Sequence, residues 1–261
     1  MTANLLSLNP SKAEFLLIDL ISNPSLSLPS NHPITPTDSA RNFGFIFASS
    51  LTFSKQISSL SSACNYHIRD IRLIRHTLDI KTVFTIATSL VHSKLGNSLY
   101  LNLPKKQISL LQLLQNSLDR AVTRTPKTEH ITTVLKSLHW LKIEERIHYK
   151  IISLTYDSLH ISQPQYLRKL INIKPAGSNR SSNHFTLLRP PTTSSLKISN
   201  RSYNRTAPIL WNNLPKSMRT FSNTSPNSAT TNQCSSLPFS LSKIQFRSHL
   251  KIFIFSISYP P

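Results

Sequence analysis

Hydrophobic side chains recur every three or four positions through most of the chain after residue 54, and this spacing predicts a series of α-helices. The first stripe contains Ile57, Leu60, Cys64, Ile68, Ile71, Arg75 and Leu78, with Arg75 as its polar exception. Later stripes predict helices over residues 83–95, 104–125, 143–154 and 164–171. The pattern at 243–257 fits a terminal amphipathic helix, with an exposed strand as the alternative.

Two short apolar runs before residue 54 have the length of β-strands. The first runs from Glu14 to Leu20, and the second from Phe43 to Phe47, where Gly44 marks a plausible bulge. Four prolines between the runs predict an irregular connection. The expected fold class is therefore mainly α with a small N-terminal β element, followed by a largely irregular basic tail.

Periodicity and composition divide the chain into three regions. The two strands belong to residues 1–54, helices fill 55–175, and a Ser/Pro/Asn-rich tail covers 176–261. Such a polar tail buries too little apolar area to offset the entropy lost on ordering. We therefore expect the tail to be mostly disordered, apart from the helix at 243–257.

Positive charge dominates the chain and is unevenly distributed. Its 261 residues include 30 Lys and Arg against 10 Asp and Glu, a formal net charge of +20. Residues 158–261 carry 13 basic side chains and no carboxylate. A field of one sign over such a length attracts polyanions. RNA or DNA bound through a basic surface is the partner that this composition predicts.

Several basic residues gather at the predicted helices and are candidates for phosphate contact. They are Arg69, Arg72 and Arg75 near the end of the first helix, Lys105 and Lys106 at the start of the third, and Arg120, Arg124 and Lys127 at its end. Cations at a helix C-terminus also complement the helix dipole, which is a purely structural role. The spacing alone leaves both interpretations open. Tyr66, Tyr149 and Tyr156 could stack on bases, although packing between helices explains them as well.

Other functional classes find little support. Three glycines far apart exclude a glycine-rich phosphate loop, and two cysteines exclude a disulfide framework or a cysteine-rich zinc site. The ten acidic residues include a single adjacent pair, Glu144 and Glu145, which point about 100° apart on a helix. We expect no metal site, no cofactor, no small-molecule ligand, no membrane span and no secretion signal. An intracellular protein of the cytoplasm or nucleus is predicted, with its oligomeric state undetermined.

Seven segments together resemble LINE-type (non-LTR) retrotransposon reverse transcriptases. The segments are Met1–Ile18, Arg41–Phe53, His67–Arg72, Gln115–Val122, Leu138–Ile151, Pro208–Pro215 and Phe246–Lys251. The resemblance implies that residues 1–54 are the end of a polymerase palm, that 55–126 are thumb-like, and that 127–175 are a C-terminal extension. In the family the catalytic Ala-Asp-Asp motif lies upstream of the position of Met1.

The same resemblance assigns roles to single residues. Lys12 occupies the palm lysine of an Asn-x-x-Lys motif, and Phe43, Gly44 and Phe45 occupy the turn that grips the primer end. The family usually has Leu-Gly-Val at this turn, so Phe43 and Phe45 depart from it. The expected function is a non-catalytic relic of a reverse transcriptase with residual sequence-independent nucleic-acid binding.

Two alternatives remain from the sequence. A translated repeat fragment would have no selected function and no stable fold. An enzyme domain that works with a separately supplied palm would restore polymerisation when the two parts are mixed.

Overall fold

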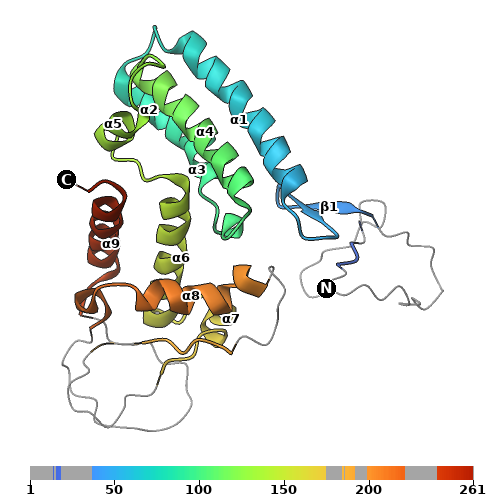
Figure 1. The fold of residues 1–261 in the computed structure, drawn as a ribbon, viewed down its shortest axis with the longest axis vertical. Coiled ribbons are helices and arrows are strands. Elements are labelled where there is room, and N and C mark those ends of the chain that lie inside the picture. The colour runs from blue at the N-terminus through green and yellow to red at the C-terminus, as the bar shows by residue number, and fades with distance from the viewer. Residues whose placement is uncertain are drawn as a thin grey trace, which may run out of the picture. The chain divides into compact units, whose positions relative to one another are not determined.

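The chain is mainly α-helical with one small sheet near its N-terminus, as the hydrophobic pattern predicts (Figure 1). The computed structural model describes Glu14 and residues 16–18, 37–174, 184, 186–191, 199–220 and 240–260. It divides into two compact units, residues 1–63 and 64–261. The boundary falls inside the first helix, α1 (Ser54–Ile74).

The sheet of the first unit is a β-hairpin. Strands β1 (Ser39–Asn42) and β2 (Phe45–Ala48) pair antiparallel, with Ser39 opposite Ala48. Phe43 and Gly44 form the two-residue turn with φ angles of 48° and 80°, the positive values that a type I′ hairpin turn requires. The prediction of one strand over 43–47 is therefore wrong at its start, because Phe43 and Gly44 reverse the chain and leave the Phe43 side chain 99% exposed.

The prediction of a buried strand from Glu14 to Leu20 is also wrong for the described residues of that segment. Leu16, Leu17 and Ile18 lie outside any strand, and the side chains of Leu17 and Ile18 are exposed. A short apolar run cannot by itself distinguish a strand from a loop that lies on a surface. The carboxylate of Glu14 accepts a hydrogen bond from the Arg41 backbone N–H at 3.0 Å.

Seven helical segments follow α1 up to residue 160. They are α2 (Ile80–Ala87), the π-turn η3 (Thr88–His92), α3 (Ser93–Leu95), the 3₁₀ turn η4 (Ser98–Tyr100), α4 (Lys105–Thr123), α5 (Ile131–Ser137) and α6 (Ile143–His160). The segments α2, η3 and α3 form one continuous helical run. It begins at Asp79, which caps the backbone N–H groups of Lys81 and Thr82, and it ends at Gly96, as predicted.

The basic tail is more ordered than its composition predicts. The helices α7 (Gln165–Lys169), α8 (Tyr203–Asn212) and α9 (Lys243–Ser258) form there and just before it, together with the 3₁₀ turns η5 (Ser199–Arg201) and η6 (Lys216–Arg219). The terminal helix is thus present, whereas α8 was not expected. Residues 184 and 186–191 are also described, and Leu187 and His184 form isolated β-bridges with Ile173 and Thr220. The remaining residues of the tail, 176–183, 185, 192–198, 221–239 and 261, lie outside the described residues.

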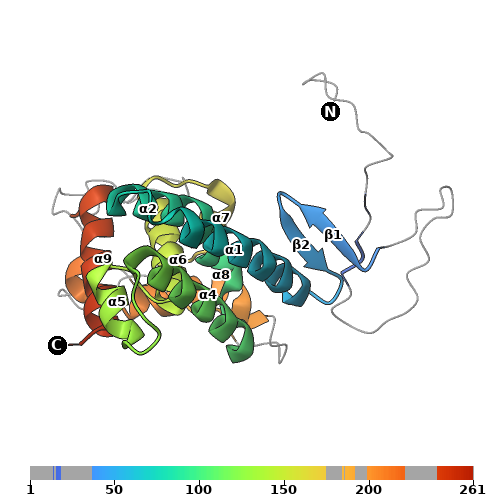
Figure 2. The same cartoon turned by 90° about the horizontal axis from the view of Figure 1, so that it is seen from above.

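A few large side chains explain the order of the tail. Trp211 of α8 and Phe246 of α9 are fully buried, and the Phe246 ring stacks on Tyr156 of α6 at 4.1 Å between centroids. These residues belong to one hydrophobic cluster that α6, α8 and α9 share, and Figures 1 and 2 show α6 and α9 side by side. Burial of a large aromatic ring contributes roughly 2–3 kcal/mol to the free energy of unfolding. Burial of Trp211 and Phe246 therefore offsets part of the entropy that α8 and α9 lose on ordering.

Among the described residues, no helix has both the length and the hydropathy of a membrane-spanning segment.

Candidate functional site

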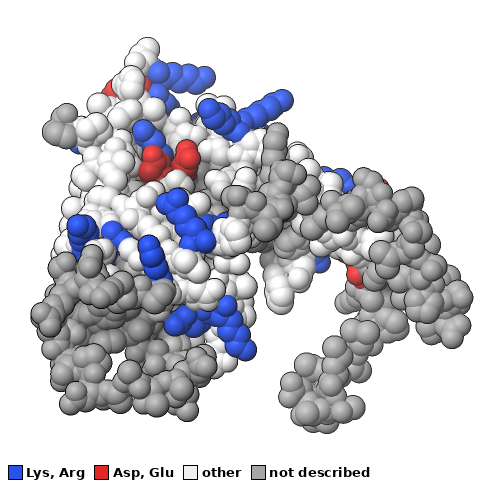
Figure 3. Space-filling view, turned by 60° about the horizontal axis from the view of Figure 1, so that its bottom comes forward, with Lys and Arg blue, Asp and Glu red and all other residues white. Residues whose placement is uncertain are grey.

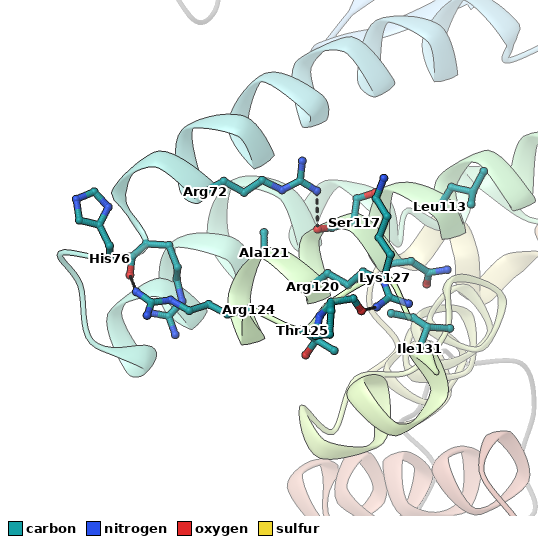
Figure 4. Close-up of a pocket in the computed structure, with 13 residues that line it drawn as sticks. Arg72, His76, Leu113, Ser117, Arg120, Ala121, Arg124, Thr125, Lys127 and Ile131 are labelled. Carbon is teal, nitrogen blue, oxygen red and sulfur yellow. Dashed lines mark hydrogen bonds between the residues drawn. The ribbon is translucent and has the colours of Figure 1, made fainter. Parts of the chain in front are cut away.

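A groove of about 780 Å³ runs along the second unit, between the end of α1, the C-terminal half of α4 and the α4–α5 connection (Figure 4). Its cationic and imidazole side chains are Arg72, Arg75, His76, Arg120, Arg124 and Lys127, and we call it the basic groove. None of the described residues that line it is Asp or Glu. The groove thus brings together five of the basic residues that the sequence singled out.

Two helix ends build this groove. Helix α1 ends at Ile74 and α4 ends at Thr123, and the Arg72 guanidinium lies 3.5 Å from the Ser117 carbonyl oxygen across the gap. The last carbonyl groups of a helix have no partner within it and form the negative pole of its dipole. Two such ends side by side favour cationic side chains between them.

Three of the arginines bind backbone carbonyl groups at these helix ends and in the connection after α4. Arg75 Nε donates to the Val122 oxygen at 2.8 Å, and Arg124 Nη2 donates to the Arg75 oxygen at 3.1 Å. Arg120 donates to the carbonyl oxygens of Pro126 and, at 2.8 Å, of Glu129. These three cations therefore have a structural role, since they tie the loop after α1 and the loop after α4 to α4.

These structural contacts do not use all the N–H donors of the groove arginines. A guanidinium group has five N–H donors, and the bonds above use one or two of them in each arginine. Arg72, Arg124 and Lys127 are exposed at the groove surface. Because these three cations are exposed and none of the described lining residues is Asp or Glu, the groove is both a structural joint and a surface of positive potential. Lys and Arg side chains are also spread over the face that Figure 3 draws, with few Asp and Glu among them.

The other predicted residues lie elsewhere. Arg69 is exposed on α1 but does not line the groove. Lys105 and Lys106 stand at the opposite end of α4 from Arg120, about 20 Å along the helix at 1.5 Å per residue. Lys105 lines a separate hollow that also contains Glu144. Lys12 lies outside the described residues.

The three residues assigned to a primer grip form a hairpin tip in the first unit. Phe43 and Gly44 make the turn, and Phe45 begins β2, where its ring lies 6.3 Å from that of Phe47. The Ile46 backbone N–H donates to the Gln56 side chain at 2.9 Å, which fixes the hairpin to the start of α1.

A buried polar cluster lies behind the groove and was not predicted from the sequence. Arg146 of α6 lies with its Nη1 2.7 Å from Nε2 of His92, and its Nη2 donates to the His92 carbonyl oxygen at 3.1 Å. The His92 ring stacks on Trp140 at 4.0 Å. Asp119 of α4 is fully buried nearby, and neither of its carboxylate oxygens has a hydrogen-bond partner among the described residues. We call Asp119, Arg146 and His92 the interior cluster.

Burial shifts the pKa of all three groups. It raises the pKa of Asp119 to about 8, although the positive charge of Arg146 opposes this rise. It lowers the pKa of His92 to about 3, helped by repulsion from Arg146, and it lowers the pKa of Arg146 to about 10. The carboxyl and the imidazole therefore favour their neutral forms at pH 7, and Arg146 carries the positive charge of the cluster.

The helical pattern contained a weak signal for the interior cluster. Asp119 directly follows Leu118 and stands three residues before Val122, so it lies at the edge of the α4 hydrophobic stripe. Gly96 lies against the other side of the interior cluster. A Cβ atom at this position would lie 2.8 Å from Nε of Arg146. Among the described residues, no three His, Cys, Asp or Glu side chains come close enough together to hold a metal ion.

Comparison with known proteins gives no match to any family model, curated protein or solved structure. The resemblance to LINE-type reverse transcriptases thus rests on the sequence segments alone.

Proposed function

We propose that the chain is a non-catalytic, LINE-type reverse transcriptase fragment that binds nucleic acid without sequence preference through the basic groove. The observation that carries this proposal is the groove itself, with five Arg and Lys side chains and no carboxylate among its described lining residues. Nucleic-acid phosphates are the polyanion that such a surface binds, with a gain from counterion release.

The chemistry of the groove fits contact with a backbone and not with base edges. Its cations come from a helix end and a loop, and three of them are already fixed by carbonyl oxygens of the fold. Contacts of this kind position a protein on phosphates and carry no sequence information. We therefore expect similar affinities for nucleic acids of different sequence and equal length.

The resemblance supplies the architectural part of the proposal. In this interpretation residues 1–54 correspond to the end of a palm, and α1 to α4 correspond to a thumb. The ten acidic residues of the chain are scattered, with one adjacent pair in the sequence. Two-metal phosphoryl transfer requires carboxylates that converge on ions about 4 Å apart, which is why we propose binding without catalysis.

A salt titration of binding tests the proposal. Fluorescence anisotropy with a labelled DNA duplex, measured from 50 to 300 mM KCl, yields the number of phosphate contacts from the slope of log K against log salt, about −0.9 per contact for B-form duplexes. We expect a slope between about −3 and −4.5, because the groove holds five permanent cations.

A pair of variants assigns the binding to the groove. Arg72→Gln with Lys127→Gln removes two exposed groove charges, whereas Lys150→Gln with Lys216→Gln removes two exposed charges from α6 and η6. The first variant is expected to make the slope less steep by about 2, and the second by less than 1. Equal effects of the two variants, or an affinity that ignores salt, would refute binding at the groove.

A further inference from the structure

A second hollow of about 480 Å³ lies between the end of α5 and the C-terminal half of α9, helices that Figures 1 and 2 both show as neighbours. Its main lining residues are Lys136, His139, Lys251, Ile252, Phe255 and Tyr259, and we call it the aromatic pocket. Its volume is within the range of sites that bind small planar groups, about 300–1,000 Å³.

Rigid contacts hold the aromatic walls of this pocket. The Tyr259 hydroxyl donates to the Trp140 carbonyl oxygen at 2.9 Å, so this buried ring forms a fixed floor. The Phe255 ring lies 4.8 Å from that of Tyr259 and 5.8 Å from that of His139, with the latter pair nearly parallel at 17°. His139 itself is exposed.

The end of helix α5 places His139 at the mouth of the pocket. Its φ angle is 53°, the left-handed conformation that commonly follows a helix, and the backbone N–H groups of His139 and Trp140 donate to the Lys136 and Leu135 oxygens at 3.2 and 3.0 Å. This conformation holds the imidazole against Phe255 at the mouth of the pocket.

The charge at the rim defines the ligand further. Lys136 and Lys251 are exposed on opposite helices, and no carboxylate is among the described lining residues. A planar apolar floor below two ammonium groups fits a flat ring that carries an anion. A nucleotide has this combination, because its base stacks on aromatic side chains while its phosphate pairs with lysine.

We propose that the aromatic pocket holds one unpaired base of a single-stranded nucleic acid, with Lys136 and Lys251 at the phosphates on either side of that base. This inference rests on the proposed function, because it gives the strand that binds in the basic groove a second point of contact. Isolated phosphates do not account for the aromatic floor, and a double-stranded end has no unstacked base to offer.

Helix α5 lies between the two sites. Ile131 at its start lines the basic groove, and Lys136 near its end lines the aromatic pocket. The two residues are about 8 Å apart along the helix axis and about 140° apart around it. A strand that occupies both sites must therefore pass around α5, so the test uses a strand of several nucleotides.

The test uses an eight-nucleotide single strand that contains 2-aminopurine, a base whose fluorescence falls when it stacks on a ring. A matched strand carries an abasic residue at the same position, with the same number of phosphates. We expect the full-length chain to quench the 2-aminopurine signal and to bind the abasic strand about 5- to 150-fold more weakly, the range for loss of one stacked base.

A single variant tests the pocket without disturbing the fold. His139→Asn removes the ring but keeps a residue that tolerates the left-handed conformation. The matched control is His130→Asn, an exposed histidine that lines neither the basic groove nor the aromatic pocket. We expect His139→Asn to lose most of the quenching and to bind the base-containing strand at least 5-fold more weakly, while His130→Asn behaves as the parent chain.

The outcomes separate this inference from the proposed function. Equal binding of the abasic and base-containing strands, with the salt slope unchanged, would overturn the pocket and leave the groove intact. If the parent chain bound neither strand, both the aromatic pocket and the proposed function would be refuted. Adenosine monophosphate in millimolar competition is expected to leave the strand bound. Full displacement by this mononucleotide would show a soluble nucleotide as the occupant, which would overturn the assignment to a strand.

Discussion

Asp119 and Arg120 are consecutive residues of α4, yet they belong to regions with opposite electrostatic behaviour. Arg120 lines the basic groove, where the neighbouring carbonyl oxygens accept its N–H groups. Asp119 is directed into the interior cluster, where burial raises the pKa of its carboxyl group to about 8. A rotation of about 100° around the helix thus separates a charge stabilised by the fold from a charge that the fold disfavours.

The difference shows which cations are available to a ligand. Arg146 lies in the interior and is committed to His92, so its charge is not available to a ligand at the surface. The groove cations combine a structural contact with exposure at the surface. A total charge of +20 therefore overstates the charge that a polyanion meets, and the position of each cation decides its role.

The largest effect is expected from Asp119→Asn. In the parent chain the folded state holds the Asp119 proton more tightly than the unfolded state, whose pKa is near 3.8. This contribution to the free energy of unfolding is present below pH 4 and is lost as pH rises toward 8, at about 1.4 kcal/mol per pH unit. The neutral asparagine lacks this dependence, so the stability of the variant relative to the parent should rise by several kcal/mol between pH 5 and pH 8.

Urea unfolding of both chains at pH 5, 6.5 and 8 measures this difference. His92 contributes in the opposite direction, because its lowered pKa stabilises the fold above pH 6.5 and withdraws that stability as pH falls toward 3. Subtracting the free energies of unfolding of the two chains at each pH removes the contribution of His92, which both chains share. Parallel stability curves would mean that Asp119 is ionised in the folded chain.

Gly96→Ala is expected to have the next largest effect, on the same cluster. The new Cβ atom would lie 2.8 Å from Nε and 3.3 Å from Nη2 of Arg146, so the guanidinium must shift from its position beside His92. Overpacking of this kind costs about 1–3 kcal/mol. The measurement is the urea midpoint of Gly96→Ala, compared with the same change made in an Arg146→Met background.

The second background isolates the clash. If the guanidinium is the obstacle, Gly96→Ala should cost much less in the Arg146→Met chain, and the coupling energy of the cycle should exceed about 0.5 kcal/mol. An equal cost in both backgrounds would place the effect in the backbone at the end of α3.

The helices were predictable because their stripes are long and regular. In α4 the residues Leu111, Leu114, Leu118 and Val122 are all buried at the predicted steps. The failures have local causes. Phe43 occupies a left-handed turn position that favours asparagine or glycine, so nothing in the sequence marks a hairpin there. The α8 helix is short, and its pattern was hidden in a polar tail, where Trp211 alone contributes a large buried surface.

The candidate site was predictable in part. Charge and spacing identified Arg72, Arg120 and Lys127, because helix ends gather cations that are close in sequence. The aromatic pocket was not predictable, since Lys136 and Phe255 are more than a hundred residues apart and meet only through the packing of α9. The tyrosines named from the sequence have other surroundings, with Tyr156 fully buried and Tyr66 exposed on α1.

The smallest expected effect on stability comes from Arg124→Gly, and it gives the sharpest separation of fold from function in the groove. Arg124 ends α4 in the left-handed conformation, with φ 60° and ψ 24°, where glycine is the residue that suits a helix best. The substitution removes an exposed bond to the Arg75 carbonyl oxygen but relieves backbone strain. We expect the chain to gain up to about 1 kcal/mol in stability.

Binding should change in the opposite direction. Loss of one phosphate contact makes the salt slope of duplex binding less steep by about 0.9 and weakens the complex. Arg124→Lys is the matched control, because it keeps the charge and the strained backbone and should retain most of the affinity. A glycine variant that is less stable than the parent would show that the carbonyl bond outweighs the strain, so that Arg124 is held there by the fold. A variant that is more stable and binds as tightly would remove Arg124 from the interface.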